Sequence, residues 1–239
     1  MGRSIRERIG RLDLRALASD LDELGHAVLP GLLSRTECAR TRALWKDPAA
    51  FRRRVDLARH RFGDHGEYRY LARPLPPLVA ALRTHLYPPL AAVANSWAER
   101  LSSPHRFPAR LAALAKQCRE QGQSEPTPLI LDYTAGGYNC LHQDLYGPLA
   151  FPLQVTIGLS QPGHDYRGGA FLLVEQRPRM QSRGDAVSLE LGDAVVFPTV
   201  ARPVRGVRGD VRATLRHGVA RVQEGHRMTL GIIFHDARS

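Results

Sequence analysis

The sequence predicts an α+β protein in which a helical N-terminal region packs against a β-sandwich or jelly roll. Residues 1–125 carry mainly helical apolar spacing. From Pro128 onward, short apolar runs alternate with Gly, Pro and Asp turns, and no helical pattern separates them. This arrangement argues against a parallel α/β sheet. At 239 residues and 43% hydrophobic, the chain can bury a sizeable core.

The helices of the N-terminal region are predicted from apolar periodicity and from capping residues. Ser34, with Glu37 three residues later, has the pattern of a capping box, and Gly25 has the position of a C-terminal glycine. Ala27–Leu33 is expected to be a short strand and turn. The expected helices are Leu12–Leu24, one that follows Ser34, Leu78–Leu86, Pro89–Leu101 and Leu111–Arg119.

Eight short strands are expected in the second half of the chain. The polar, proline-containing stretch Gln121–Pro128 separates the two regions, 1–125 and 126–239. We expect the helices to pack on the barrel as one structural unit. The expected strands are Leu129–Tyr133, Asn139–Leu145, Gln154–Ser160, Ala170–Glu175, Ala186–Glu190, Ala194–Phe197, Arg212–His217 and Arg227–His235.

The composition argues against membrane and secretory classes. The chain has no run of 18 apolar residues, so no membrane span is expected, and its first residues lack the apolar core of a signal peptide. Cys38, Cys118 and Cys140 are odd in number and far apart, which argues against a disulfide framework. We therefore expect a cytoplasmic protein, with Cys140 as a neighbour of the candidate site rather than a ligand.

The net charge of +11 favours an anionic partner, either nucleic acid or an acidic small molecule. Arginines cluster at Arg52–Arg61 and Arg202–Arg216. The alternative is a solvated basic face without a specific partner. The basic segment Thr199–Arg216 is either a plain surface loop or one that shapes access to a site.

His142 and Asp144 are the first candidate metal ligands. In a strand, residues i and i+2 point to one face, so His-x-Asp places an imidazole beside a carboxylate. A distant second histidine completes the set of two histidines and one carboxylate that non-haem Fe(II) oxygenases use, and His217 is the candidate. The competing match His65-Gly66-Glu67 is interpreted as a loop, because no strand is expected before it. His235-Asp236 is expected to be structural.

Arg227 is the candidate anchor for a dicarboxylate co-substrate. A planar guanidinium binds a carboxylate through two hydrogen bonds, and Thr229 lies on the same face of the strand. The alternatives are a surface arginine and a strand-filling threonine.

These motifs and their order resemble the Fe(II)/2-oxoglutarate dioxygenase superfamily over about residues 129–236. Tyr133-x-x-Gly136 with His142-x-Asp144 is similar to prolyl-4-hydroxylase-type members. Gly168-Gly169-x-Phe171, Gly192-Asp193-x-x-x-Phe197 and His217 followed by Val222-x-x-Gly225-x-Arg227 resemble the later blocks of the superfamily. Leu141–Gly147 and Gly231–Asp236 carry a closer resemblance to a bacterial family thought to act on alkylated nucleic acid.

The resemblance implies a double-stranded β-helix, with Fe(II) held by His142, Asp144 and His217. It implies 2-oxoglutarate bound by Arg227, Thr229 and Tyr133, although Tyr133 is equally suited to the barrel core. O2 would be the oxidant and ascorbate a possible stimulant, with succinate and CO2 as co-products. Hydroxylation of an N-methyl group would release formaldehyde.

Tyr138, Gln154 and Arg216 are further candidates for the cavity lining. Hydroxylation of a protein side chain or of a small metabolite is an alternative activity. A jelly-roll binding protein without enzymatic activity is a third reading, against which the complete ligand set argues.

Overall fold

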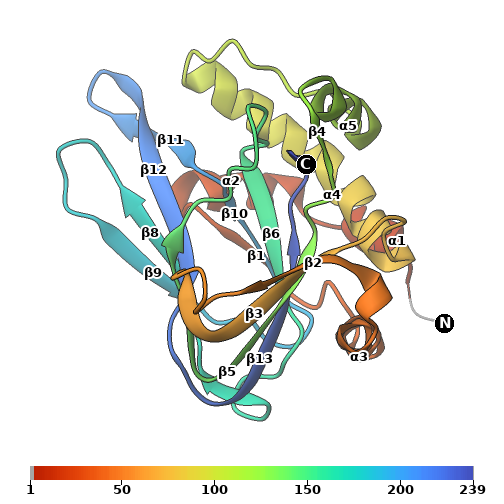
Figure 1. Ribbon diagram of the computed structural model, residues 1–239. Helices are drawn as coiled ribbons and strands as arrows, with labels where there is room; N and C mark the ends of the chain where they lie inside the picture. The colour runs from red at the N-terminus through yellow and green to blue at the C-terminus, as the bar shows by residue number, and fades with distance from the viewer. Residues whose placement is uncertain (1–2, 239) are drawn as a thin grey trace.

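One curled antiparallel sheet forms the centre of the structure (Figure 1), a computed structural model that describes residues 3–238. Its strands follow the order β1-β10-β6-β13-β5-β12-β8-β9, while β3 also pairs with β5 and β2 pairs with β3. A small second sheet pairs β4 with β14. The strands are β1 (Ala27–Leu29), β2 (Phe51–Asp56), β3 (Gly63–Leu71), β4 (Gln123–Glu125), β5 (Leu129–His142), β6 (Leu153–Gly158), β7 (Tyr166–Gly168), β8 (Phe171–Gln176), β9 (Arg183–Val187), β10 (Ala194–Pro198), β11 (Ala201–Gly206), β12 (Gly209–Val219), β13 (Val222–Ile232) and β14 (Ala237–Arg238).

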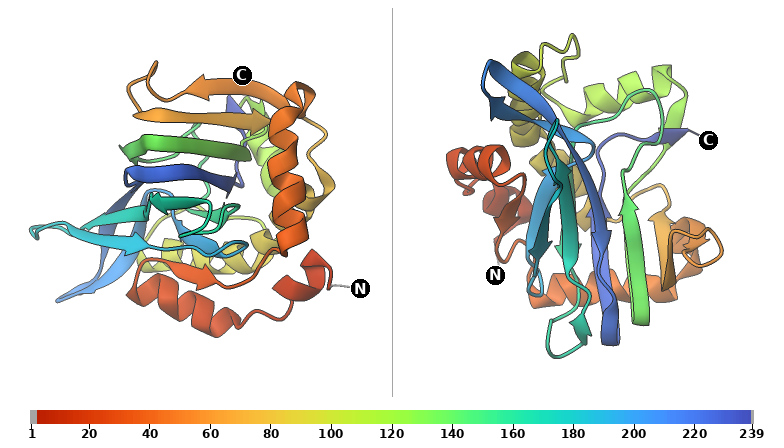
Figure 2. Two further views of the ribbon diagram at one scale, coloured as in Figure 1. Left: turned by 90° about the horizontal axis from the view of Figure 1, so that it is seen from below. Right: turned by 90° about the vertical axis from the view of Figure 1, so that its left-hand side faces the viewer.

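The helices lie in the first half of the chain and gather outside the curled sheet (Figures 1 and 2). They are α1 (Ile5–Ile9), α2 (Leu14–Glu23), α3 (Arg35–Ala43), α4 (Pro77–Arg100) and α5 (Leu111–Glu120), with two 3-10 turns, Leu44–Lys46 and Pro48–Ala50. The expected capping box of Ser34 and Glu37 is present, and Gly25 has a φ of 86° directly after α2. None of the described helices is long and apolar enough to cross a membrane.

Alternation along the strands gives the sheet an apolar face and a site-bearing face. On β13, Met228, Leu230 and Ile232 pack into the core that the helices cover, whereas Arg227 and Thr229 line a cavity on the opposite face. This follows from the two-residue period of a strand. The same period places alternate residues of β5 and β6 in the helix-covered core and in the cavity wall. The expected jelly-roll architecture with helices against it is confirmed.

One expected helix boundary is wrong. Leu78–Leu86 and Pro89–Leu101 are not two helices, because α4 runs through both and contains Pro88 and Pro89 in its interior. A proline in a helix removes a backbone hydrogen bond, which is why the sequence predicts a break there. Leu82, Leu86 and Leu90 are buried on both sides of the prolines. Their packing offsets the lost hydrogen bonds.

The expectation of a mainly helical first half is wrong for residues 51–71. β2 and β3 form a hairpin there, and β3 pairs with β5 along most of its length. The candidate loop at His65 is part of β3, at an irregularity in its register with β5. The sequence hides this hairpin because three of the six residues of β2 are arginine, and its one buried residue, Val55, packs against Leu129 and Ile233 from distant segments.

β5 and the basic segment 199–216 also differ from expectation. β5 is one strand of 14 residues, not two short ones, and it ends at His142. The basic segment is neither loop alternative but the hairpin of β11 and β12. Arg202 in this hairpin is fully buried, and its Nε donates to Glu175 Oε2 at 2.7 Å. β9 begins and ends three residues before the strand expected at Ala186–Glu190.

Candidate metal centre and co-substrate cavity

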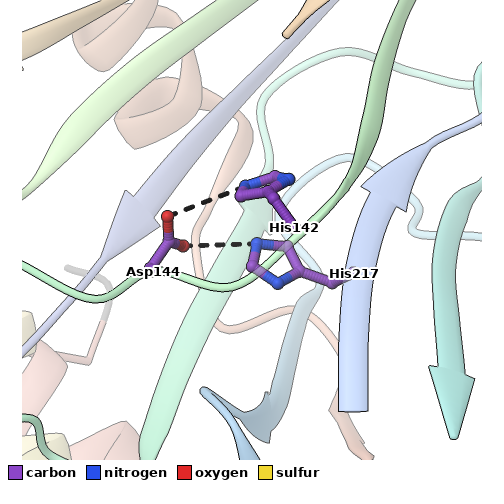
Figure 3. A group of neighbouring side chains, drawn as sticks. All are labelled: His142, Asp144 and His217. Atoms are coloured by element: carbon purple, nitrogen blue, oxygen red, sulfur yellow. Dashed lines mark ion pairs between the residues drawn. The ribbon is translucent and has the colours of Figure 1, made fainter.

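Strand pairing brings the two histidines of the candidate metal site together. His142 is the last residue of β5, and His217 on β12 is its direct partner in the antiparallel register. The two imidazole centroids are 4.2 Å apart. Asp144 lies two residues beyond the end of β5, so the expected strand around Asn139–Leu145 stops short of it. The chain then turns the carboxylate toward both rings (Figure 3).

The spacing of the three side chains fits one small metal ion. His217 Nε2 lies 3.2 Å from Asp144 Oδ2, and His142 Nε2 lies 3.6 Å from Asp144 Oδ1. All three ligand atoms lie within 4.8 Å of one another. Ligands about 2.1 Å from a metal and at right angles are about 3 Å apart. The donor set therefore suits a site that leaves coordination positions open for other molecules.

Neighbouring groups orient the ligands. His142 Nδ1 lies 2.8 Å from the Cys140 carbonyl oxygen, a contact that directs Nε2 toward Asp144. Burial, followed by the proximity of His217, lowers the pKa of His142, so its neutral ligating form dominates. Tyr146 donates its hydroxyl proton to Asp144 Oδ1 at 2.8 Å, and the Tyr70 hydroxyl contacts Tyr146 at 3.1 Å.

Asp144 is held in its charged form. Burial alone would raise its pKa, but the hydrogen bond and charge of His217, the charge of His142 and the Tyr146 hydroxyl outweigh that effect. The pKa of Asp144 therefore lies well below its usual range. An ionised carboxylate is the form of Asp144 that metal binding requires.

A cavity of about 350 Å³ opens beside the triad. Its wall combines the triad with residues of β5, β6 and β13 and with the turn between β2 and β3. The lining includes Arg61, Phe62, Tyr133, Asn139, Leu141, Leu145, Tyr146, Gln154, Arg227 and Thr229.

Arg227 is a buried cation without an anion. Arg227 is 3% exposed, and its Nε and Nη1 have no hydrogen-bond partner among the described residues. No ion pair joins it to any carboxylate among the described residues. Tyr133 and Tyr166 lie at its sides, with ring centroids 5.6 Å and 6.0 Å from the guanidinium carbon. A buried charge without a partner is costly, so this guanidinium fits an anionic ligand that enters the cavity.

Tyr133 and Gln154 add hydrogen-bonding groups to the wall. Burial raises the pKa of Tyr133 to about 12, so its hydroxyl keeps its proton and accepts a hydrogen bond from Asn139 Nδ2 at 3.3 Å. Gln154 is buried, and its Nε2 has no hydrogen-bond partner in the part of the chain that the structure describes. Thr229 lies on the same face as Arg227, as the two-residue spacing predicts.

Two predicted lining residues lie outside this cavity. Arg216 is exposed because it neighbours His217 on β12 and adjacent strand residues point to opposite faces. Tyr138 packs instead under Arg221, whose guanidinium carbon is 5.0 Å from the ring centroid. His65, from the competing motif, belongs to none of the metal-binding groups found among the described residues.

Sequence reasoning missed Tyr146 and the turn residues Arg61 and Phe62. Tyr146 stands two residues after Asp144, an offset that was available as a signal. Arg61 and Phe62 had no such signal, because they reach the cavity only through the pairing of β3 with β5.

Comparison with known proteins identifies the family. Residues 66–237 match the model of a family described as an oxygenase catalysing oxidative methylation of damaged DNA. Uncharacterised proteins from two strains of Mycobacterium tuberculosis are each 47% identical over 164 residues, covering 69% of this chain and 70% of theirs.

Solved structures show the same fold at low sequence identity. An oxidoreductase of the 2OG-Fe(II) oxygenase family from Burkholderia pseudomallei has a TM-score of 0.53 and 16% identity, covering 95% of this chain and 93% of that one. A prolyl-4-hydroxylase from Pseudomonas putida has a TM-score of 0.51 and 14% identity, covering 95% and 100%. The chain belongs to the matched oxygenase family.

Proposed function

We propose that the protein is a 2-oxoglutarate-dependent Fe(II) dioxygenase in which His142, Asp144 and His217 bind the metal and Arg227 anchors the distal carboxylate of 2-oxoglutarate. The observation that carries the proposal is the buried guanidinium of Arg227, which has no carboxylate partner among the described residues and lies in the same cavity as the triad. Thr229 and the protonated Tyr133 hydroxyl are the neighbouring hydrogen-bonding groups. Together with O2, the bound metal and co-substrate supply the oxidising power for hydroxylation of a C–H bond.

The protein's own contribution is positioning, charge and exclusion of water. Asp144 remains ionised, and Tyr146 holds one of its oxygens. Arg227 acts from a site where burial strengthens its attraction for a carboxylate. With 2-oxoglutarate bound and a substrate across the cavity mouth, the apolar and aromatic side chains of the wall would keep water from the reacting groups.

The proposed primary substrate is a nucleic acid that carries an N-alkylated base. The family description names damaged DNA, and the net charge of +11 favours a polyanion. An oxygenase that hydroxylates an N-methyl group leaves a hydroxymethyl product that loses formaldehyde. Removal of the methyl group is therefore the net change that we propose.

Coupled product assays test this function. With Fe(II), ascorbate and an oligonucleotide that contains one N-methylated base, the purified protein should convert 2-oxoglutarate to succinate and CO2. It should release formaldehyde from the methyl group in an amount equal to the succinate. Matched assays use the unmethylated oligonucleotide, a proline-containing peptide and small metabolites. Succinate release that follows the peptide or a metabolite alone would refute nucleic acid as the substrate.

We also infer that the protein works in a reducing compartment such as the cytoplasm. Cys38, Cys118 and Cys140 are all free thiols in the structure.

A further inference from the structure

Three large apolar side chains stand exposed at the rim of the cavity. Phe62 is 48% exposed, Leu141 41% and Leu145 54%, and all three contribute to the cavity lining. Phe62 comes from the turn between β2 and β3, whereas the leucines flank His142 and Asp144. Apolar groups gathered beside a functional cavity indicate a contact surface. They also border a shallow metal site, because the His142 side chain is itself 36% exposed.

The turn that carries Phe62 is held firmly while its ring faces outward. The Phe62 backbone N–H donates to the Leu57 carbonyl at 3.0 Å, and its carbonyl accepts from the Cys140 N–H at 2.7 Å. Leu57 is fully buried and anchors the turn. Gly63 packs so closely on β5 that a Cβ would lie 2.1 Å from the Tyr138 carbonyl oxygen. These backbone contacts hold the Phe62 ring at the cavity rim. The β5 residue that Phe62 contacts is Cys140, two residues before His142.

An aromatic pair and free arginines share this turn. The His60 ring stacks on Phe62, with centroids 5.5 Å apart and planes inclined by 21°. Arg59 and Arg61 are exposed, and neither forms an ion pair with a described carboxylate. Their guanidinium groups are available to an anion from outside the chain.

The acidic groups of the hairpin are already engaged. Asp56 accepts the Arg59 backbone N–H, and Asp64 lies 3.8 Å from His65. Glu67 pairs with Arg54 and Arg69. The hairpin therefore presents an excess of positive charge beside the cavity.

We propose that the turn of residues 57–62, here called the rim turn, holds an unpaired nucleotide of a nucleic-acid strand at the cavity. Phe62, supported by His60, stacks on a base, while Arg59 and Arg61 bind the flanking phosphates. Flat aromatic rings combined with guanidinium groups match the alternation of bases and phosphates along a single strand. This inference rests on the proposed function, and it assigns residues to the strand-binding step.

Equilibrium binding tests the stacking role. The probe is a short fluorescein-labelled single-stranded oligonucleotide with one N-methylated base, followed by fluorescence anisotropy. Phe62→Ala should weaken binding by about tenfold or more, because loss of base–aromatic stacking has an effect of that order. Phe62→Trp, which keeps a stacking surface, should retain binding within about threefold of the parent. Since Phe62 is exposed, both variants should unfold at the parent's temperature.

Salt dependence tests the phosphate role. The double variant Arg59→Gln/Arg61→Gln should reduce the slope of log affinity against log salt by about 1.4, or about 0.7 for each phosphate contact on a single strand. The matched control is Arg35→Gln/Arg40→Gln on α3. It removes the same charge from exposed arginines at the other end of the β2–β3 hairpin (Figures 1 and 2). This control should change the salt slope and the affinity less than the rim-turn variant does. Its effect measures how much the loss of net charge alone contributes.

The outcomes separate this inference from the proposed function. If the parent protein neither binds the oligonucleotide nor releases formaldehyde from it, both proposals fail. If the parent binds and demethylates the probe but Phe62→Ala and the rim-turn double variant behave like the α3 control, the rim turn is not the binding surface and the proposed function stands.

Discussion

Replacing Arg227 with methionine should uncouple the stability of the protein from its ability to bind 2-oxoglutarate. Methionine is a flexible apolar side chain that can fill much of the volume of the arginine stem. In the ligand-free protein the guanidinium is buried with two unpartnered N–H-bearing atoms, each costing about 1–3 kcal/mol. Contacts with Tyr133 and Tyr166 return about 1 kcal/mol each. We therefore expect the ligand-free variant to be at least as stable as the parent.

The effect on co-substrate binding should be large and opposite. Removing one partner of a buried, hydrogen-bonded charge pair costs about 2–5 kcal/mol. That corresponds to an increase in Kd of about thirtyfold to several-thousandfold. Titration calorimetry of 2-oxoglutarate into Ni(II)-loaded protein measures the Kd without turnover. Urea unfolding of the metal-free protein measures the stability.

Arg216→Met is the matched control, because Arg216 is one residue from His217 but exposed and outside the cavity. It should bind 2-oxoglutarate as the parent does. Arg227→Lys should give an intermediate Kd, since an ammonium keeps the charge but loses the two-pronged hydrogen bonding. The anchor assignment is wrong if Arg227→Met binds 2-oxoglutarate within twofold of the parent.

Four further outcomes are expected. Asp144→Ala should abolish succinate release and Ni(II) binding while the circular dichroism spectrum is retained; unchanged turnover would overturn the ligand assignment. Tyr146→Phe should weaken Ni(II) binding by about tenfold in calorimetry, because the hydroxyl orients Asp144 Oδ1; parent-like affinity would deny it that role. Glu175→Gln should lower the free energy of unfolding by about 3–5 kcal/mol in urea, because it leaves the buried Arg202 charge uncompensated; a change below about 1 kcal/mol would contradict this. Burial lowers the pKa of His235 to about 4, so the unfolded chain binds more protons below about pH 6.5. The free energy of unfolding should therefore be unaffected by His235 above pH 6.5 and should fall by up to about 3 kcal/mol between pH 6.5 and pH 4. In urea unfolding measured across this pH range, His235→Gln should reduce that fall.

Much of the site could be predicted from local sequence because its chemistry is short-range. His142 and Asp144 are two residues apart, and Arg227 and Thr229 share one strand face, so a period of two predicts which side chains meet. On the opposite face of the same segment, Leu230, Ile232 and Phe234 lie in the core, as the same period requires. It also contradicts the prediction for Arg216, which could have been excluded by its position next to His217.

The remaining features depend on pairing between distant segments, which local sequence does not encode. The β2–β3 segment looks like an exposed polar stretch because it is rich in arginine. The sequence does not show that some of these arginines have partners in distant segments, such as Glu125 for Arg52. From the sequence, Arg202 looks like a surface charge, whereas in the structure it is buried in an ion pair with Glu175 on β8. Pro88 and Pro89 predict a helix break that packing prevents.

The order and spacing of two histidines, a carboxylate and an arginine are typical of iron oxygenases, so the class of chemistry can be predicted from local sequence. The way in which these groups meet depends on the pairing of distant strands. The antiparallel pairing of β5 with β12 sets His217 opposite His142, and the packing of β13 buries Arg227 with no carboxylate partner among the described residues. The pairing of β3 with β5 brings Arg61 and Phe62 to the cavity rim from a segment about 80 residues before His142. The physical reason is that ligand identity is a local property, whereas burial and the neighbours of a charge arise only when distant strands pair.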